Sequence, residues 1–223
     1  MLFRSNIFRH RTNFVAVMNG RMNEETIQHL SAADKTLARL IRKVGPCTLK
    51  PERNCSPFQS LVRSVAYQQL TGKAAATILG RVKELFPGKK FPEPEDLVEI
   101  PVEHLRAAGL SGAKVASVKD IAAKTLSGVV PTAKEIRKLS NEEILERLTT
   151  IRGVGPWTVE MLLMFRLGRP DILPVTDYGV RKGFALTYKL NELPSPKELL
   201  AHGEKWRPYR TTAAWYLWRS LEL

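Results

Sequence analysis

Hydrophobic residues recur every three or four positions along most of the chain, which is the spacing of amphipathic helices. The first well-patterned run follows Ser31 and Asp34, which stand three positions apart as in a capping box, and it stops at Gly45-Pro46. The pattern predicts a helix that begins after a capping residue and buries one face. The apolar residues on that face are Leu37, Leu40, Ile41 and Val44.

Similar signals predict helices in the rest of the chain. Serine or proline marks many of the expected starts, and glycine or proline marks many of the ends. No segment shows a convincing alternation of apolar and polar residues, and no long glycine- or serine-rich linker divides the chain. The predicted fold class is therefore all-α, packed as one compact unit. The expected starts lie at or near Ser56, Gly72, Pro94, Pro101, Ser111, Thr132, Ser140, Pro156, Asp177, Pro196 and Pro208.

Composition and charge narrow the function. The length of 223 residues suits one domain. Hydrophobic residues make up 43% of the chain and charged residues 26%, a composition typical of a globular protein. Lys and Arg number 35 against 22 Asp and Glu, a net charge of +13 that favours a polyanionic partner, nucleic acid ahead of a membrane surface. No apolar run approaches the roughly 18 residues of a spanning helix, so we expect no membrane association.

The N-terminal segment and the cysteines add two expectations. Residues 1–21 contain four arginines and no acidic residue, as in a transit peptide, a mobile arm or a stretch before a later start codon. We expect a mobile basic arm, followed by one domain over 22–223. Cys47 and Cys55 are too few for a four-thiolate iron–sulfur or zinc site, and we expect two reduced thiols.

The segment from Leu148 to Thr158 carries the most informative local pattern. It places two glycines, Gly153 and Gly155, between two expected helices, the second of which begins at Pro156. Glycines allow close approach of the backbone to a ligand, and N–H groups at a helix start favour an anion such as a DNA phosphate. An ordinary helix–helix turn would also use glycine.

Four ordered segments together resemble the helix-hairpin-helix DNA glycosylase superfamily, in its 3-methyladenine DNA glycosylase II branch. The resemblance implies two helical lobes, residues 57–169 and residues 22–56 with 170–223, and an active-site cleft between them. It also implies excision of a flipped alkylated purine from duplex DNA. The four segments are residues 67–75 (YQQLTGKAA), 148–158 (LTTIRGVGPWT), 173–179 (LPVTDYG) and 206–210 (WRPYR).

In that family an aspartate follows the hairpin by some twenty residues, and Asp177 matches it. Breaking a purine N-glycosidic bond leaves positive charge on the sugar, which a carboxylate can stabilise while it helps to orient water. The alternative is that Asp177 only caps the following helix. Family members that also cut the backbone carry a Schiff-base lysine where this chain has Trp157, so the resemblance implies a monofunctional enzyme. The endonuclease III branch also carries a four-cysteine iron–sulfur cluster beyond its aspartate, and because no cysteine follows Cys55 here, we expect no cluster.

The resemblance assigns further residues to the base pocket and to DNA. Trp157, Met161 and Trp218 match the pocket, where an aromatic face would attract a cationic purine, although tryptophans on helices commonly belong to the core. Gln69 matches a plug for the vacated base space and Leu110 a wedge, and Thr71 stands where some relatives have histidine. The other expected DNA contacts are Gly72, Lys73, Gly153, Val154, Gly155 and Thr158. A structural Na⁺ or K⁺ is implied at the main-chain carbonyls of Thr149, Ile151 and Gly153, with no catalytic cofactor.

We therefore expect a monofunctional alkylpurine DNA glycosylase, a monomer that acts on double-stranded DNA inside the cell, in the nucleoid or the nucleus. It would excise cationic bases such as 3-methyladenine and 7-methylguanine and so start base excision repair. Three alternatives stay open: a non-catalytic helix-hairpin-helix DNA-binding protein, a glycosylase for uracil, oxidised or mismatched bases, and a basic RNA-binding helical protein.

Overall fold

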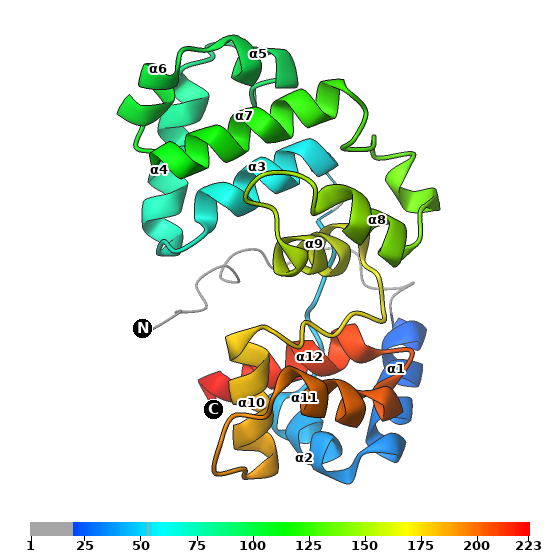
Figure 1. The fold of residues 1–223 in the computed structure, drawn as a ribbon. Coiled ribbons are helices and arrows are strands. Elements are labelled where there is room, and N and C mark those ends of the chain that lie inside the picture. Colours follow the sequence, from blue (N-terminus) through cyan, green and yellow to red (C-terminus); the bar gives the residue numbers. More distant parts are fainter. Residues whose placement is uncertain (1–19, 53) are drawn as a thin grey trace. The chain divides into compact units, whose positions relative to one another are not determined.

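The computed structural model describes residues 20–52 and 54–223, and over these residues it contains helices and no strand (Figure 1). The predicted all-α class is confirmed. The described chain divides into two compact units, Glu52–Leu167 and residues 20–51 with Gly168–Leu223. The expected arm, residues 1–21, lies outside the described residues except for its last two, which begin a helix.

The first unit is organised around its longest helix, α7, which contacts α3, α5 and α6 (Figure 1). Helix α9 packs against α3 and α8 and continues into a π-helical turn. The elements of this unit are α3 (Pro57–Tyr67), α4 (Gly72–Glu84), α5 (Pro94–Glu99), α6 (Val102–Ala107), α7 (Gly112–Leu126), a 3₁₀ turn (Ile136–Lys138), α8 (Asn141–Leu148), α9 (Pro156–Leu162) and the π-helical turn (Leu163–Leu167).

Serine caps start three of these helices, as their sequences predict. Ser56 and Ser140 each complete a capping box, with Gln59 and Glu143, and Ser111 accepts a hydrogen bond from the N–H of Lys114. Behind the caps, each helix buries one apolar stripe against α7 or its neighbours. A fully buried large aliphatic side chain contributes about 1.5–3 kcal/mol, so these stripes dominate the stability of the unit. Buried members include Leu61, Val65, Val118, Ile121 and Ile144.

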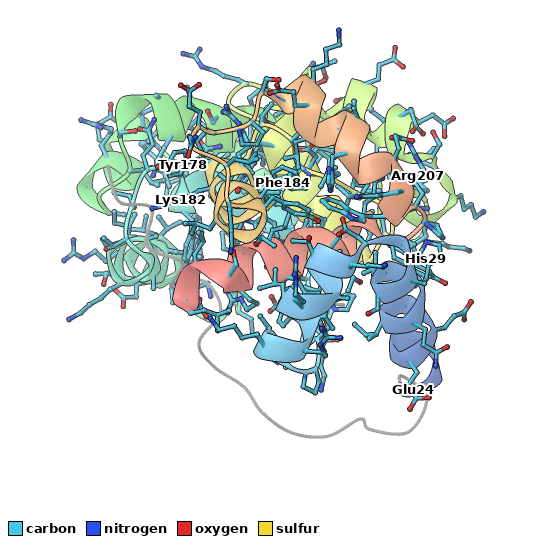
Figure 2. The ribbon with its side chains drawn as sticks, turned by 90° about the horizontal axis from the view of Figure 1, so that it is seen from below. Glu24, His29, Tyr178, Lys182, Phe184 and Arg207 are labelled. Atoms are coloured by element: carbon cyan, nitrogen blue, oxygen red, sulfur yellow. The ribbon has the colours of Figure 1, made fainter. Side chains whose placement is uncertain are left out.

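The second unit brings both ends of the described chain into one core. Helix α12 contacts α2 and α10, and Trp206 and Tyr216 are fully buried. Along α10, Phe184 is buried whereas Tyr178 is 52% exposed (Figure 2). The elements are α1 (Gly20–Ala33), α2 (Lys35–Val44), α10 (Tyr178–Tyr188), α11 (Pro196–Gly203), a 3₁₀ turn (Glu204–Trp206), α12 (Arg210–Arg219) and a final 3₁₀ turn (Ser220–Glu222).

Three local expectations are corrected. Ser31 is not a cap, because α1 runs through it to Ala33, and Asp34 alone caps α2 by accepting hydrogen bonds from the N–H groups of Thr36 and Leu37. The element near Thr132 is only a 3₁₀ turn. The last helix begins at Arg210 rather than Pro208.

Asp34 is the polar centre of the second unit. One carboxylate oxygen caps α2, and the other accepts from Tyr188 Oη at 2.5 Å, from Trp206 Nε1 at 3.1 Å and from Lys205 Nζ at 3.0 Å. His202 Nε2 lies 3.1 Å from the same oxygen. Burial opposes ionisation, but these hydrogen bonds outweigh it and hold the pKa of Asp34 well below its usual value. The ionised carboxylate thus joins α2, α10 and α11.

This network predicts acid sensitivity of the second unit. Because the pKa of Asp34 is lower in the folded state, its contribution is fully present above the ordinary aspartate pKa and is lost as pH falls toward the folded pKa. Burial also lowers the pKa of His202, so as pH falls through the ordinary histidine range the unfolded chain binds a proton at this ring before the folded chain does, which adds to the loss. Asp34→Asn should cost about 3–5 kcal/mol at neutral pH and flatten the acid limb. Urea unfolding from pH 3 to 8 measures the free energy of unfolding of Asp34→Asn, with a substitution of an exposed residue, Glu192→Gln, as the control. If the stability of the two variants depends on pH in the same way, this prediction is wrong.

Candidate functional site

Asp177 lies at the start of α10 with extended backbone and a half-buried side chain. Its Oδ1 accepts a hydrogen bond from the N–H of Val180 at 2.8 Å, so its role as a helix cap is confirmed. The same oxygen accepts from Trp218 Nε1, also at 2.8 Å. Two donors on one oxygen fix the orientation of the carboxylate. The catalytic role is separate from this cap and stays a prediction.

Trp218 contacts the aspartate through the edge of its indole, a contact that the sequence did not reveal. Gly179 makes room for it, because a Cβ at that position would lie 2.9 Å from Trp218 Cδ1 and 3.1 Å from Asp177 Oδ1. Gly179 belongs to the segment that carried the family resemblance, but its neighbour was not evident there. A side chain at position 179 would displace the indole and weaken its hydrogen bond to the carboxylate.

The chain that leads to Asp177 is held by α12. Arg210 is 8% exposed and donates to both carboxylate oxygens of Asp171, from Nε at 2.6 Å and from Nη2 at 2.9 Å. Thr211 Oγ1 accepts from the N–H of Ile172 at 3.0 Å. Arg210, which ends the segment 206–210 that carries the family resemblance, thus anchors the irregular chain before Asp177 through its ion pair with Asp171.

The glycine hairpin connects α8 to α9 in the first unit, and its two glycines differ in backbone conformation and in the space around them. Gly153 has φ +74°, and a Cβ there would lie 2.3 Å from Ser117 Oγ on α7. Gly155 has φ −93°, and no atom lies within 4 Å of its would-be Cβ. Only Gly153 is therefore required by the fold. Gly155 leaves an exposed, open backbone at the start of α9.

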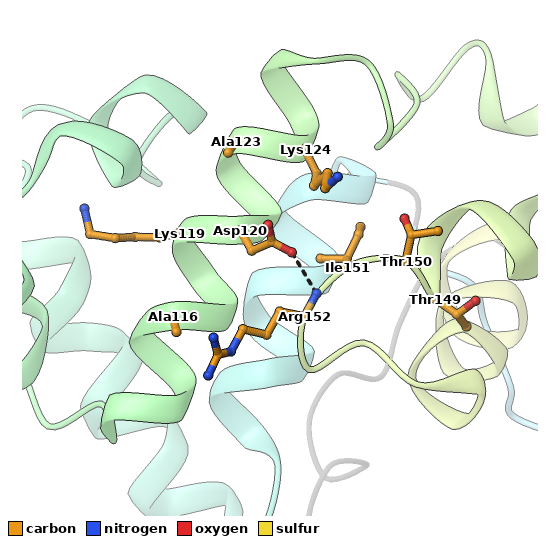
Figure 3. A pocket seen from close by; sticks show the side chains of 9 residues that line it. All are labelled: Ala116, Lys119, Asp120, Ala123, Lys124, Thr149, Thr150, Ile151 and Arg152. Carbon is orange, nitrogen blue, oxygen red and sulfur yellow. Dashed lines mark hydrogen bonds between the residues drawn. The ribbon is translucent and has the colours of Figure 1, made fainter.

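The hairpin is tied to α7 on one side and to α3 on the other. The N–H of Arg152 donates to Asp120 Oδ2 at 2.7 Å, across an open pocket of about 700 Å³ (Figure 3). Gln68 Nε2 donates to the carbonyl of Gly153 at 3.0 Å. The pocket lining is mostly basic and polar: Ala116, Lys119, Asp120, Ala123, Lys124, Thr149, Thr150, Ile151 and Arg152.

Several predicted DNA contacts lie at the surface of the first unit, and others are buried. Gly153, Gly155, Gln69, Thr71 and Lys73 are exposed, and Gly72 is half-buried. Thr71 caps α4 by accepting from the N–H of Ala74 at 3.3 Å. Three further predicted contacts are buried, namely Leu110 (3% exposed), Val154 (3%) and Thr158 (2%).

Burial changes the interpretation of those three residues. In this conformation the Leu110 side chain is part of the core, so it would have to leave the core to enter the base stack as a wedge, and that role stays a prediction. The hydroxyl of Thr158 faces Gln68, with Nε2 at 3.4 Å. Val154 can offer DNA only its backbone, and its N–H already donates to the carbonyl of Ile151.

The two remaining pocket candidates lie on α9. Trp157 and Met161 stand four positions apart, so they share one face of the helix, and both are half-buried. They belong to the first unit, whereas Asp177 and Trp218 belong to the second. Each unit therefore contains one tryptophan and one further candidate.

The part of the chain that the structure describes contains neither a cluster of metal-binding side chains nor a candidate membrane span. There, no group of three or more His, Cys, Asp and Glu residues could hold a metal ion. None of the described helices is long and apolar enough to cross a membrane. Cys47 and Cys55 are free thiols, and burial raises the pKa of Cys47 to about 11.

The described chain is helical, with a glycine hairpin between two helices and an aspartate oriented by two donors, which is the arrangement of a helix-hairpin-helix protein. A sequence model of the HhH-GPD superfamily, described as base excision DNA repair proteins, matches residues 62–208. The chain belongs to this family. The suspected superfamily and its alkylpurine branch are both confirmed by named relatives.

Similar proteins cover most of the chain. DNA-3-methyladenine glycosylase 1 of Schizosaccharomyces pombe is 43% identical over 87% of this chain and 86% of its own length. The alkylbase DNA glycosidase-like protein mag2 of the same yeast is 35% identical over 86% and 91%. The solved S. pombe 3-methyladenine DNA glycosylase in complex with abasic DNA has a TM-score of 0.80 and 42% identity, covering 89% of this chain and 97% of that one. A DNA-3-methyladenine glycosidase structure from Bacillus halodurans has a TM-score of 0.78 and 38% identity, over 87% and 88%.

Proposed function

We propose that this chain is a monofunctional DNA glycosylase that hydrolyses the N-glycosidic bond of alkylated purines, such as 3-methyladenine and 7-methylguanine, in duplex DNA. It thereby starts base excision repair. The observation that carries the proposal is the oriented carboxylate of Asp177, at the position where the family resemblance expects a catalytic aspartate. Relatives named DNA-3-methyladenine glycosylase support the substrate class.

The chemistry assigned to Asp177 is electrostatic. As the bond to the base breaks, the sugar gains positive charge, and a carboxylate already held in place stabilises that charge without reorganising. The Trp218 indole and the N–H of Val180 both bind Oδ1, so they restrict rotation of the carboxylate. The same carboxylate orients the water that attacks the sugar. No side chain forms a covalent bond with DNA in this scheme.

The preference for alkylated purines combines leaving-group chemistry with stacking. Alkylation at purine N3 or N7 puts a positive charge on the base, which makes it a better leaving group. A tryptophan face attracts a cation by about 0.5–2 kcal/mol, and we assign this contact to Trp157, with Met161 beside it. Trp218, the third pocket candidate, contributes through its hydrogen bond to Asp177.

Duplex DNA is bound mainly through its phosphates. The net charge of +13 supplies the long-range attraction, and the exposed backbone at Gly155 with the Lys73 ammonium supplies close contacts. Gln69 fills the space that the flipped base leaves. Affinity for any duplex should therefore fall steeply as salt is raised.

The hairpin also suits a monovalent cation. Carbonyl oxygens are the donors that hard cations prefer, and those of Ile151 and Gly153 each accept one hydrogen bond, from Val154 N–H and Gln68 Nε2, which leaves a second lone pair. We assign Na⁺ or K⁺ to these oxygens with that of Thr149. Bound there, the ion would add positive charge near a DNA phosphate.

We further propose that the protein is a monomer located with the DNA. Size-exclusion chromatography tests the oligomeric state, and cell fractionation tests the location.

The monofunctional assignment makes a direct prediction. Trp157 has no amine, so no Schiff base with an abasic sugar should form at this position. Borohydride added during the reaction should trap no protein on DNA, and strands should break only after alkali or an added endonuclease. A glycosylase with lyase activity, run in parallel, is the positive control. A reduced covalent complex, or cleavage without alkali, would overturn the assignment.

A panel of defined duplexes tests the function against its alternatives. Each duplex carries one lesion: 7-methylguanine, hypoxanthine, uracil, 8-oxoguanine or a mismatch. The proposal expects the fastest excision for the cationic 7-methylguanine. Fastest excision of uracil, 8-oxoguanine or a mismatched base would favour a different glycosylase, and binding without any excision would favour a non-catalytic DNA-binding protein.

A further inference from the structure

Lys114 on α7 is the centre of a junction that no catalytic or DNA-binding assignment includes. Its Nζ donates to the carbonyl of Ala66 at 2.8 Å and to that of Gln68 at 2.7 Å. These two carbonyls lie at the C-terminal end of α3, where a cation also complements the helix dipole. Burial lowers the pKa of Lys114, so the ammonium is kept at some cost, and the two hydrogen bonds offset it.

The residue held by this junction is the predicted plug. Gln69 has φ +58°, the left-handed region that a non-glycine residue enters at a cost of about 1–2 kcal/mol. Its side chain is exposed. Since Lys114 binds the carbonyl of the preceding residue, it restrains the peptide that leads into this strained conformation. The hydrogen bond from Lys114 to the carbonyl of Gln68 therefore helps to hold Gln69 in its strained conformation.

Gln68 connects the same turn to the hairpin. Its Nε2 donates to the carbonyl of Gly153 at 3.0 Å and lies 3.4 Å from Thr158 Oγ1 on α9. Gly153 is itself fixed against Ser117 of α7, three residues from Lys114. Helix α7 thus supports both the turn at Gln69 and the hairpin, and the Gln68 side chain joins them directly.

We propose that Lys114 and Gln68 are positioning residues that hold Gln69 at a fixed position relative to the hairpin. When the hairpin binds a phosphate, Gln69 then lies at the space left by the flipped base. This inference rests on the proposed function. It assigns to Lys114 and Gln68 an effect on base flipping that is separate from general DNA affinity. The effect passes through Gln69, and neither residue needs to touch DNA.

Lys119 offers a matched control on the same helix. Its Nζ also donates to two carbonyls, those of Val98 at 2.8 Å and Ile100 at 2.6 Å, at the C-terminal end of another helix, α5. Lys119→Met and Lys114→Met therefore remove the same kind of interaction, and only Lys114→Met releases the turn at Gln69. A merely structural role predicts equal effects of the two variants.

The experiment measures flipping and excision separately. Fluorescence of 2-aminopurine beside a 7-methylguanine reports flipping, single-turnover release reports excision, and binding to an undamaged duplex reports general affinity. Lys114→Met and Gln68→Ala should each lower flipping and excision by about tenfold to a hundredfold, with duplex affinity changed less than about threefold. Lys119→Met should lose far less flipping and excision than Lys114→Met, and Lys114→Arg, which keeps the donors, should restore most of the loss.

A double-mutant cycle tests whether the effect passes through Gln69. In a Gln69→Ala background, Lys114→Met should add little further loss, because the plug is already absent. If the losses of Lys114→Met and Gln69→Ala add fully in the double variant, or if Lys114→Met and Lys119→Met lose equal activity, this inference is overturned while the proposed function stands. If Lys114→Met does not fold, Gln68→Ala carries the same cycle. Absence of excision by wild type would instead refute the proposed function, and this inference with it.

Discussion

Asp177→Asn should lower single-turnover excision of 7-methylguanine by about 10²–10³-fold, the usual effect of removing one preorganised electrostatic contact. Asparagine has no negative charge to oppose the charge on the sugar. Its side-chain oxygen can still accept from Val180 N–H and Trp218 Nε1, the two donors that Asp177 Oδ1 binds. The cap is therefore kept, and the melting temperature should move by less than about 2 °C.

Two controls make this result specific. Asp177→Asn should bind a duplex with an abasic site as wild type does, which excludes misfolding and loss of DNA binding. Trp218→Phe, which removes the indole donor to Asp177 and leaves the charge, should lose less activity than Asp177→Asn. A stable Asp177→Asn protein that excises at nearly the wild-type rate would show that Asp177 is only a helix cap.

The two hairpin glycines should respond differently to the same substitution. Gly155→Val should fold, since nothing lies within 4 Å of the new Cβ and the extended backbone before Pro156 suits a β-branched residue. The side chain should keep a phosphate away from the hairpin, weakening binding to all duplex sequences alike by about tenfold to a hundredfold, the value of a hydrogen bond to a charged group. Titration of labelled duplexes at two salt concentrations measures this.

Gly153→Val is the matched comparison. With φ +74° and Ser117 Oγ 2.3 Å from the new Cβ, it should destabilise the first unit by more than about 2 kcal/mol before DNA is added. Urea unfolding separates the two variants. If Gly155→Val binds duplex DNA as wild type does, the hairpin is only a structural turn, and if Gly153→Val is as stable as wild type, the packing described for Gly153 is wrong.

Local signals predicted most helix starts because the responsible residues are adjacent in sequence. Ser56, Ser140 and Asp177 bind N–H groups three residues ahead, so their roles are visible in the sequence itself. Helix α1 was missed for a related reason. Among its described side chains, from Glu24 to Ala33, only Thr26 and Leu30 are buried, so no clear apolar face marks it, and contacts with α2 and the 3₁₀ turn Glu204–Trp206 hold it instead.

The site was harder to predict because its supporting contacts join distant segments. Family resemblance pointed to Asp177, but the indole that orients it is 41 residues away, and the Gln68 contact to Gly153 spans 85 residues. A pattern cannot reveal such pairs without the fold. Burial is equally hidden from a pattern: Leu110 has the right side chain for a wedge, but the fold places it in the core.

The central claim is that this chain hydrolyses alkylated purines from DNA, and the most direct measurement is the release of free bases from methylated duplex DNA. Products are separated by chromatography after incubation with wild-type protein, and with Asp177→Asn as the matched blank. The account predicts free 3-methyladenine and 7-methylguanine from the wild type, intact strands, and almost none of either base from the variant. Bound DNA with no free methylpurine above the blank would contradict it.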